Sequence, residues 1–207
     1  MARRTKEEAQ VTRDRILDMA EHEFHRRGVS RTSLQDIARA AGLTRGAIYW
    51  HFQDKADLFD AMMNRVTLPL EQEIRRSDEP GLDDPVGHIR RSFTAALRKT
   101  VEDAQARRVF EIAVHKVEYV DELEAVRERR LTGLRERLAH VERGLRAAAR
   151  AGDLGGGVPA RAAALGLHSL IDGLIQNWLL DPDAFDLLRV GRQAIDAYLT
   201  GLGDRQR

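Results

Sequence analysis

Apolar residues recur every three or four positions along almost the whole chain, and polar residues occupy the positions between them. In residues 10–27, for example, Ile16, Ala20 and Phe24 fall on one side of a helix. No segment shows the strict two-residue alternation that indicates a half-buried strand. The pattern therefore predicts an all-α protein of about nine helices.

Glycine, proline and acidic residues predict where these helices end. Gly28 follows the first helix in the position of a C′ glycine. Pro69 falls inside the fourth helix and predicts a kink or an early end, because proline removes a backbone hydrogen bond. Residues 77–84 predict a linker and residues 152–159 a loop. The last two helices are expected over residues 159–180 and 182–202.

Two short helices joined by a turn at Gly42 are predicted in the first quarter of the chain. The N-cap of the first is either Thr32 or Ser33, since each is followed three residues later by a side chain that can complete a capping box. Thr44 is positioned to cap the second short helix. This arrangement is typical of a helix-turn-helix, in which the second helix enters the major groove of DNA.

Side chains on and around the second short helix suit contacts with DNA. Arg45 can form two hydrogen bonds with guanine, and Gly46 lets the backbone approach the groove closely. Ala47 fits either a thymine methyl contact or the core, and Tyr49 and Trp50 fit either DNA contact or packing. Hydroxyl and basic groups nearby can bind phosphates. The expected DNA-binding residues are Thr32, Ser33, Thr44, Arg45, Gly46, Ala47, Tyr49, Trp50, His51 and Lys55.

Composition and charge agree with a DNA-binding protein of ordinary globular type. The 207 residues carry a net charge of +1 and no cysteine, which suits a reducing cytoplasm. Residues 1–55 hold 11 Lys and Arg against 8 Asp and Glu, a modest excess that favours phosphate contact. The most apolar segment, residues 165–180, is interrupted by polar side chains and predicts no membrane span.

An enzyme is the first alternative, and the sequence offers little for it. His22 and His25 have a spacing used by metal ligands, but they are expected on an exposed helix face beside two glutamates. No nucleophile motif and no phosphate-binding glycine loop is present in the sequence. We expect no catalytic residues, no metal and no cofactor.

The motif residues closely resemble the TetR family of transcriptional regulators over about residues 10–60. Further segments are similar to the AcrR/TtgR branch of that family, repressors of multidrug efflux pump genes. The family signature is matched by Gly28, residues 32–38, 41–42 and 45–52, and Lys55. The branch is matched by residues 2–9, 107–108, 111–112, 115–116, 172–175 and 178–180.

The resemblance implies a DNA-binding domain over residues 1–55 and a ligand-binding and dimerisation domain over residues 56–207. It also implies a homodimer in which the last two helices of each subunit form a four-helix bundle. The penultimate helix has two apolar faces, of which one can line a pocket while the other meets a partner. The expected dimer residues are Leu170, Leu174, Trp178, Ile195 and Leu199.

A pocket for a lipophilic or aromatic inducer is also expected, although each proposed lining residue fits simple core packing equally well. Asp172 is expected either to orient a ligand or to make a salt bridge or a bundle contact. The expected lining residues are Val66, Leu70, Phe93, Leu97, Phe110, Val114, His168, Ile171, Asp172 and Ile175.

The resemblance implies a ligand-responsive repressor of a multidrug efflux operon, released from its operator by a small molecule that favours a swung fourth helix. A regulator of a catabolic or biosynthetic operon and a helical protein-binding adaptor are the alternatives. An activator fits the same sequence, because the position of the operator decides between activation and repression.

Overall fold

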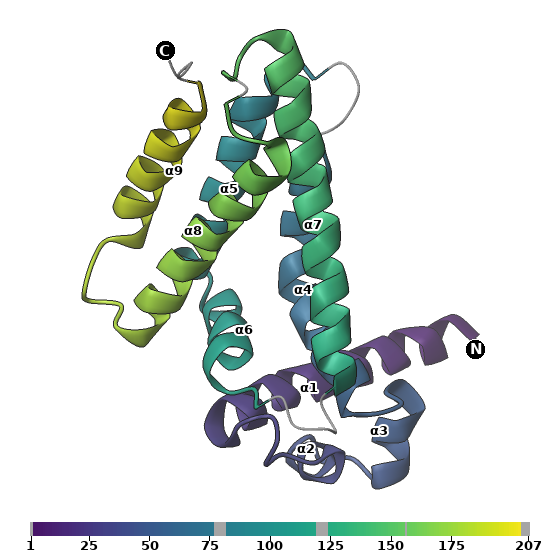
Figure 1. Cartoon of the computed structure of the whole chain (residues 1–207). Helices are drawn as coiled ribbons and strands as arrows, with labels where there is room; N and C mark the ends of the chain where they lie inside the picture. The colour runs from purple at the N-terminus through teal and green to yellow at the C-terminus, as the bar shows by residue number, and fades with distance from the viewer. Residues whose placement is uncertain (1, 77–81, 119–123, 156, 204–207) are drawn as a thin grey trace. The chain divides into compact units, whose positions relative to one another are not determined.

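The chain folds into helices throughout the part that the computed structural model describes, residues 2–76, 82–118, 124–155 and 157–203, with side chains described from residue 6 (Figure 1). Within these ranges there are nine helices and no strand, so the predicted all-α class is confirmed. The helices are α1 (Ala2–Arg27), α2 (Leu34–Ala40), α3 (Arg45–His51), α4 (Lys55–Arg75), α5 (Pro85–Glu102), α6 (Ala104–His115), α7 (Glu124–Ala151), α8 (Ala160–Leu180) and α9 (Leu187–Gly203).

Three helix boundaries differ from the sequence prediction. Helix α1 begins at Ala2 instead of residue 10, because residues 2–9 are mostly good helix formers. Helix α4 continues through Pro69 to Arg75, so of the two effects predicted for this proline, a kink or an early end, the early end does not occur. Buried side chains on both sides of the proline hold the helix in place. Helix α9 begins at Leu187, after a turn in which Asp186 accepts a hydrogen bond from the Arg189 amide at 2.9 Å.

The predicted linker lies partly in residues 77–81, outside the described residues. Where the description resumes, Asp84 caps α5 as predicted: its carboxylate accepts a hydrogen bond from the Gly87 amide at 2.7 Å, and Pro85 is the first helical residue.

The chain divides into two compact units. The first comprises Met1–Val66 and Arg108–Arg130, and the second comprises Thr67–Arg107 and Leu131–Arg207. Helices α4, α6 and α7 therefore each contribute residues to both units.

The core of the first unit is built on the predicted apolar stripe of α1. Ile16, Ala20 and Phe24 are fully buried, as the periodicity predicted. The ring centroid of Phe24 lies 6.2 Å from that of Phe59 on α4. Ile37 of α2 is fully buried as well, so α2 and α4 both contribute to this core.

The second unit depends on close helix packing around α9. A Cβ atom added to Gly191 on α9 would lie 2.3 Å from a methyl carbon of Leu97 on α5. A Cβ atom on Gly166 of α8 would lie 2.2 Å from the Tyr198 hydroxyl, which donates a hydrogen bond to the Ala163 carbonyl at 3.0 Å. Glycine at both positions therefore allows α9 to approach its neighbours closely.

None of the helices in the described ranges combines the length and the apolar character needed to cross a bilayer.

Candidate nucleic-acid interface

The N-terminus of α2 is fixed by a capping box between Ser33 and Asp36. The Ser33 hydroxyl accepts a hydrogen bond from the Asp36 amide, and the Asp36 carboxylate accepts one from the Ser33 amide, both at 3.1 Å. Of the two caps that the sequence left open, the structure uses Ser33. The Ser33 side-chain hydrogen bond, followed by the Ser33 backbone hydrogen bond, lowers the pKa of Asp36.

The turn between α2 and α3 depends on Gly42, whose φ of +64° lies in the left-handed region that favours glycine. The amide of Leu43 donates to the Ala38 carbonyl at 2.8 Å and closes the turn. Thr44 then caps α3 as predicted, since its hydroxyl accepts a hydrogen bond from the Ala47 amide at 3.2 Å. Capping and the glycine turn together set the direction in which α3 leaves α2.

Helix α3 buries one side and exposes the other. Ile48 has no exposed surface, whereas Tyr49 is 47% and Trp50 72% exposed. Arg45 and Gly46 are exposed as well. Large aromatic side chains are seldom left this open unless a partner covers them. The outward face of α3 therefore carries the residue types that contact bases and phosphates.

Two aromatic contacts organise this outward face. The guanidinium carbon of Arg45 lies 5.5 Å from the centre of the Tyr49 ring, a cation–π arrangement one helical turn apart. The Trp50 ring meets the His51 ring edge-on, with centroids 4.6 Å apart. Burial, followed by the charge of Arg13, lowers the pKa of His51.

Two of the expected DNA-binding side chains are engaged inside the protein. Thr32 is 1% exposed, and its hydroxyl donates to the Gly28 carbonyl at 2.8 Å. The ammonium of Lys55 donates to the carbonyls of Val29 and Ser30 at 3.0 and 3.2 Å. Both residues hold the loop that leads into α2 in place through these hydrogen bonds. The spacing of the motif residues along the sequence did not indicate this role. Among the other expected contacts, Ser33 and Thr44 are exposed and Ala47 is half-buried.

The expected ligand-lining residues are divided between the two units. Val66, Phe110 and Val114 belong to the first unit and the other seven to the second. Phe93, Leu97 and Ile171 are buried, and Leu70, His168 and Ile175 are half-buried. Burial is the main cause that lowers the pKa of His168. Asp172 is exposed and accepts a hydrogen bond from Gln176 at 2.5 Å.

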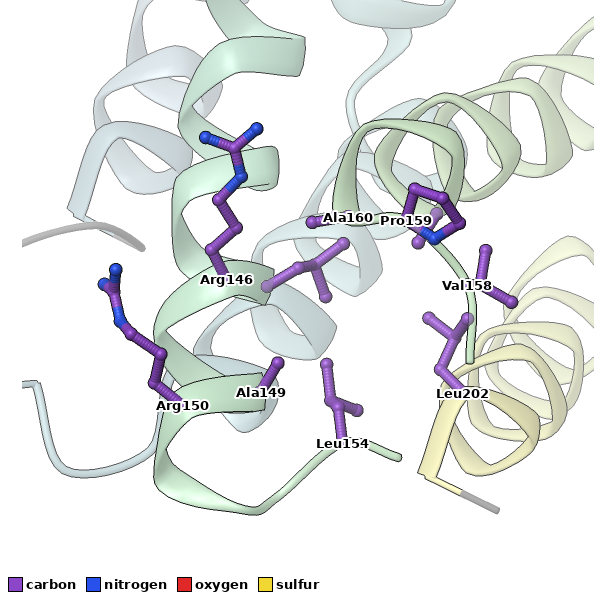
Figure 2. Close-up of a pocket in the computed structure, with 10 residues that line it drawn as sticks. Arg146, Ala149, Arg150, Leu154, Val158, Pro159, Ala160 and Leu202 are labelled. Carbon is purple, nitrogen blue, oxygen red and sulfur yellow. The ribbon is translucent and has the colours of Figure 1, made fainter. Parts of the chain in front are cut away.

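A cavity of about 470 Å³ lies in the second unit, between α7, α8, the loop that joins them and α9 (Figure 2). None of the expected ligand-lining residues borders it. Figure 2 shows the guanidinium groups of Arg146 and Arg150 turned away from Val158 and Leu202. The part of the cavity wall that Val158 and Leu202 form is therefore apolar. Arg146 instead pairs with Glu142 on its own helix.

The residues expected at the dimer interface are already covered by other parts of the same subunit. Trp178, Ile195 and Leu199 are buried, and Leu170 and Leu174 are half-buried. Helix α8 exposes a different stripe, whose members recur every three or four residues. Its most exposed apolar residues are Leu165 and Leu180, and the stripe comprises Ala162, Leu165, Ser169, Asp172, Gln176 and Leu180.

Sequence reasoning missed Glu21, a buried carboxylate on α1 that pairs with Arg108 of α6 at 2.6 Å. Glu21 lies one turn from Leu17 and Phe24, on the apolar stripe of the helix. An acidic residue on such a stripe is the signal that points to a buried partner. Of the two histidines that have metal-ligand spacing, His25 has its imidazole 3.1 Å from Glu111. The described residues contain no group of three or more side chains suited to a metal ion.

Known proteins match both parts of the chain. Residues 16–62 match the family described as bacterial regulatory proteins, tetR family, and residues 84–203 match the C-terminal region of MAATS-type transcriptional repressors. The HTH-type transcriptional regulator TtgR of Pseudomonas putida is 42% identical over 188 residues, which cover 91% of this chain and 90% of TtgR. AcrR of Shigella flexneri is 40% identical and covers 94% of this chain and 91% of its own length.

Solved structures agree with the sequence matches. NalD, the secondary repressor of the MexAB-OprM multidrug efflux pump in Pseudomonas aeruginosa, superimposes with a TM-score of 0.87 at 36% identity, covering 97% of this chain and all of NalD. SmeT, the repressor of the Stenotrophomonas maltophilia multidrug efflux pump SmeDEF, has a TM-score of 0.83 at 35% identity, covering 95% and 92%. The chain is a member of the TetR family of transcriptional regulators.

Proposed function

We propose that this protein is a ligand-responsive repressor that binds operator DNA through α3 and controls a multidrug efflux operon. The observation that carries the proposal is the division of α3 between a buried Ile48 and an outward face with Arg45, Tyr49 and Trp50. The relatives NalD and SmeT, each described as a repressor of a multidrug efflux pump, support the operon assignment.

In this proposal, the DNA-binding function belongs to residues 1–55, and ligand binding and dimerisation belong to residues 56–207. Arg45 reads a base edge in the major groove, because it sits in the first turn of α3. Ser33, at the N-terminus of α2, and Thr44, at that of α3, lie where helix dipoles and free amides favour phosphates.

A homodimer places two α3 helices on successive major grooves, about 34–36 Å apart. The exposed stripe of α8 from Ala162 to Leu180 is the surface that we assign to the partner subunit. Leu165 and Leu180 supply apolar area there, and Asp172 and Gln176 supply polar groups at the same surface. Asp172 then makes a bundle contact, which is one of the roles that the sequence left open.

The ligand in this proposal is a lipophilic or aromatic molecule that releases the operator. A complex of SmeT with triclosan, a chlorinated aromatic compound, supports this class. Buried aromatic and aliphatic residues such as Phe93 and Ile171 suit such a ligand, and the half-buried His168 offers an imidazole for hydrogen bonding. We place the protein in the cytoplasm, where the operator is.

The test is binding of the purified protein to the DNA upstream of its own gene, measured by fluorescence anisotropy against scrambled DNA of equal length. We expect at least about a thousandfold preference for the upstream DNA, and an affinity that falls steeply with salt. Triclosan should weaken this binding. Equal affinity for the two DNAs would overturn the proposed function, while tight binding without any response to triclosan would overturn only the ligand class.

A further inference from the structure

The cavity of the second unit has no role in the function proposed above. It lies between α7, α8, the loop that joins them and α9 (Figure 2). Its volume of about 470 Å³ falls within the range of about 300–1,000 Å³ that is usual for small-molecule sites. All of its lining residues belong to the second unit, and none is shared with the expected inducer site. Substitutions in the cavity therefore distinguish a ligand bound there from an inducer.

Hydrogen bonds connect the elements around this cavity. The Gly155 amide, in the loop after α7, donates to the Leu202 carbonyl of α9 at 2.9 Å. The Tyr198 hydroxyl of α9 donates to the carbonyl of Ala163, a lining residue on α8, at 3.0 Å. These bonds hold α8 and this part of the loop against α9. The cavity is therefore formed before a ligand enters, which lowers the ordering cost of binding.

Most of the cavity wall is apolar, since eight of the ten lining residues have aliphatic side chains. Leu145 is buried, Leu154 and Leu202 are half-buried, and Val158 is 43% exposed. Figure 2 shows Leu154 of the loop between Ala149 on α7 and Leu202 on α9. Such a wall suits an apolar chain or ring, because covering it removes apolar surface from water.

The charge at the cavity is positive. Among the described lining residues, Arg146 and Arg150 are charged and none is acidic. The two arginines stand one helical turn apart on α7, where like charges repel. Arg146 pairs with Glu142 on its own helix, whereas Arg150 is exposed and has no ion pair with a described residue. An anion at the cavity therefore finds a complementary charge in Arg150.

The start of α8 adds to this positive potential. Pro159, at the N-cap position, and Ala160, the first helical residue, both line the cavity. No side chain caps this end of the helix. The partial positive charge of a helix N-terminus favours a negative group nearby, as the guanidinium of Arg150 does.

We propose that this cavity is a second ligand site and that it binds an amphipathic anion. The apolar chain or ring of the ligand lies among Leu145, Leu154 and Leu202, and its carboxylate or sulfate group lies at the mouth with Arg150. The stem of Arg150 borders the apolar wall while its charged head stays in water, where a rotation of the side chain brings it to the anion.

The proposed dimer does not use this site. The exposed stripe of α8 that we assign to the partner subunit contains neither Ala160 nor Ala163, the two α8 residues that line the cavity. The site also makes no use of α3, so its occupancy can be measured without DNA. Failure of this proposal leaves the proposed function standing, and the reverse holds as well.

The test is calorimetric titration of the full-length protein with octanoate and with 1-octanol, which have the same chain length and differ in charge. We expect octanoate to bind about fivefold more tightly than 1-octanol, the order of an exposed ion pair. Arg150→Gln should remove this preference and leave the affinity for 1-octanol unchanged. Arg135→Gln, at an exposed position of α7 outside the cavity, is the matched control and should keep the preference.

A second variant locates the site. Ala149→Phe fills the cavity from α7 and should weaken both probes by at least about tenfold, because the apolar chain loses its place. Ala151→Phe adds the same ring at an exposed position outside the cavity and should bind as the wild type does. Octanoate that binds at the inducer site is unaffected by Ala149→Phe, so an unchanged affinity in this variant would overturn the proposal.

Val158→Asp keeps the test decisive if Ala149→Phe does not fold. It places a negative charge at an exposed loop position of the cavity and should weaken octanoate more than 1-octanol. Val11→Asp, at an exposed valine of α1, is its control and should change neither affinity. Absence of octanoate binding to the wild type contradicts the site, and a preference for octanoate that survives in Arg150→Gln contradicts the anion.

Discussion

The ammonium of Lys55 lies 3.0 Å from the carbonyl oxygen of Val29, so the first residue of α4 holds the loop that ends α1. A second hydrogen bond to the Ser30 carbonyl, at 3.2 Å, completes the contact. The loop leads directly into α2, and its position decides where the helix-turn-helix begins. Lys55 therefore stabilises the motif from within, in addition to any contact that it makes with phosphate.

Lys55→Ala should lower the free energy of unfolding by about 1–3 kcal/mol, because the hydrogen bonds from a charged donor disappear and two carbonyls are left without that partner. Thermal or urea unfolding measures this directly. Lys6→Ala, which removes the same charge from an exposed position on α1, is the control and should leave stability unchanged. If the two variants unfold alike while Lys55→Ala only flattens the salt dependence of DNA binding, Lys55 acts at phosphate alone.

Arg45→Ala should weaken operator binding by about 1–3 kcal/mol and relax the base preference at one position of each half-site. The physical reason is that alanine cannot form the two hydrogen bonds that a guanidinium makes with a base edge. Binding to a set of operators with single substitutions measures the preference. Arg39→Ala removes an equal charge from α2 and should weaken all sequences uniformly; a relaxed preference in this control as well would argue against Arg45 as the reading residue.

Trp50→Ala should reduce operator affinity and Ile48→Ala should reduce folding stability, since the Trp50 side chain is exposed and that of Ile48 is fully buried. Trp50→Ala should cost about 2 kcal/mol of operator affinity, as expected when a large aromatic side chain is removed from an interface, with little effect on unfolding. Ile48→Ala should lower the free energy of unfolding by about 2–5 kcal/mol. Anisotropy and urea unfolding on both variants check the contrast, and reduced stability in Trp50→Ala would place its ring in a packing role.

Stability should fall on mild acidification because of His51. Burial, then the charge of Arg13, lowers the pKa of His51 in the folded state below its ordinary value of 6.5. The unfolded chain then binds more protons, so the stability contributed by His51 is complete above about pH 6.5 and decreases as the pH falls below that value. His168 shifts in the same direction, chiefly through burial.

The measurement is the unfolding temperature of wild type and of His51→Gln between neutral and mildly acidic pH. The wild-type value should drop more than that of His51→Gln. His22→Gln, an exposed histidine on α1, is the control and should follow the wild type. A variant His51→Gln with the full wild-type pH dependence would show that other groups cause it.

The stability contributed by Asp36, whose pKa is lowered by its capping hydrogen bonds, is lost only at more acid pH, below 3.8.

Leu180→Glu should weaken the proposed dimer, because it places a charge on the most exposed apolar residue of the α8 stripe. Sedimentation velocity should show monomer at concentrations where the wild type is dimeric. Leu68→Glu, at an exposed leucine of α4, is the matched control and should remain dimeric. If both variants stay dimeric, the partner binds elsewhere than on this stripe.

The sequence by itself determined the helices and the type of DNA-binding motif, because periodicity, caps and glycine turns act between residues that are close along the chain. The buried stripe of α1, the Thr44 cap and the turn at Gly42 are of this kind. Alternatives remained where two local solutions were equivalent, as for Thr32 and Ser33 at the N-terminus of α2. Even there, local patterns reduced the choice to neighbouring residues.

Only the tertiary structure decided which helix face meets which partner. In the folded protein the hydroxyl of Thr32 and the ammonium of Lys55 bind backbone carbonyls of the same chain, and Ile195 and Leu199 are buried within one subunit. The pair of Glu21 and Arg108, 87 positions apart, is invisible to any local pattern. The physical reason is that a helix repeat fixes which residues share a side, whereas the element that covers that side depends on packing between distant parts of the chain.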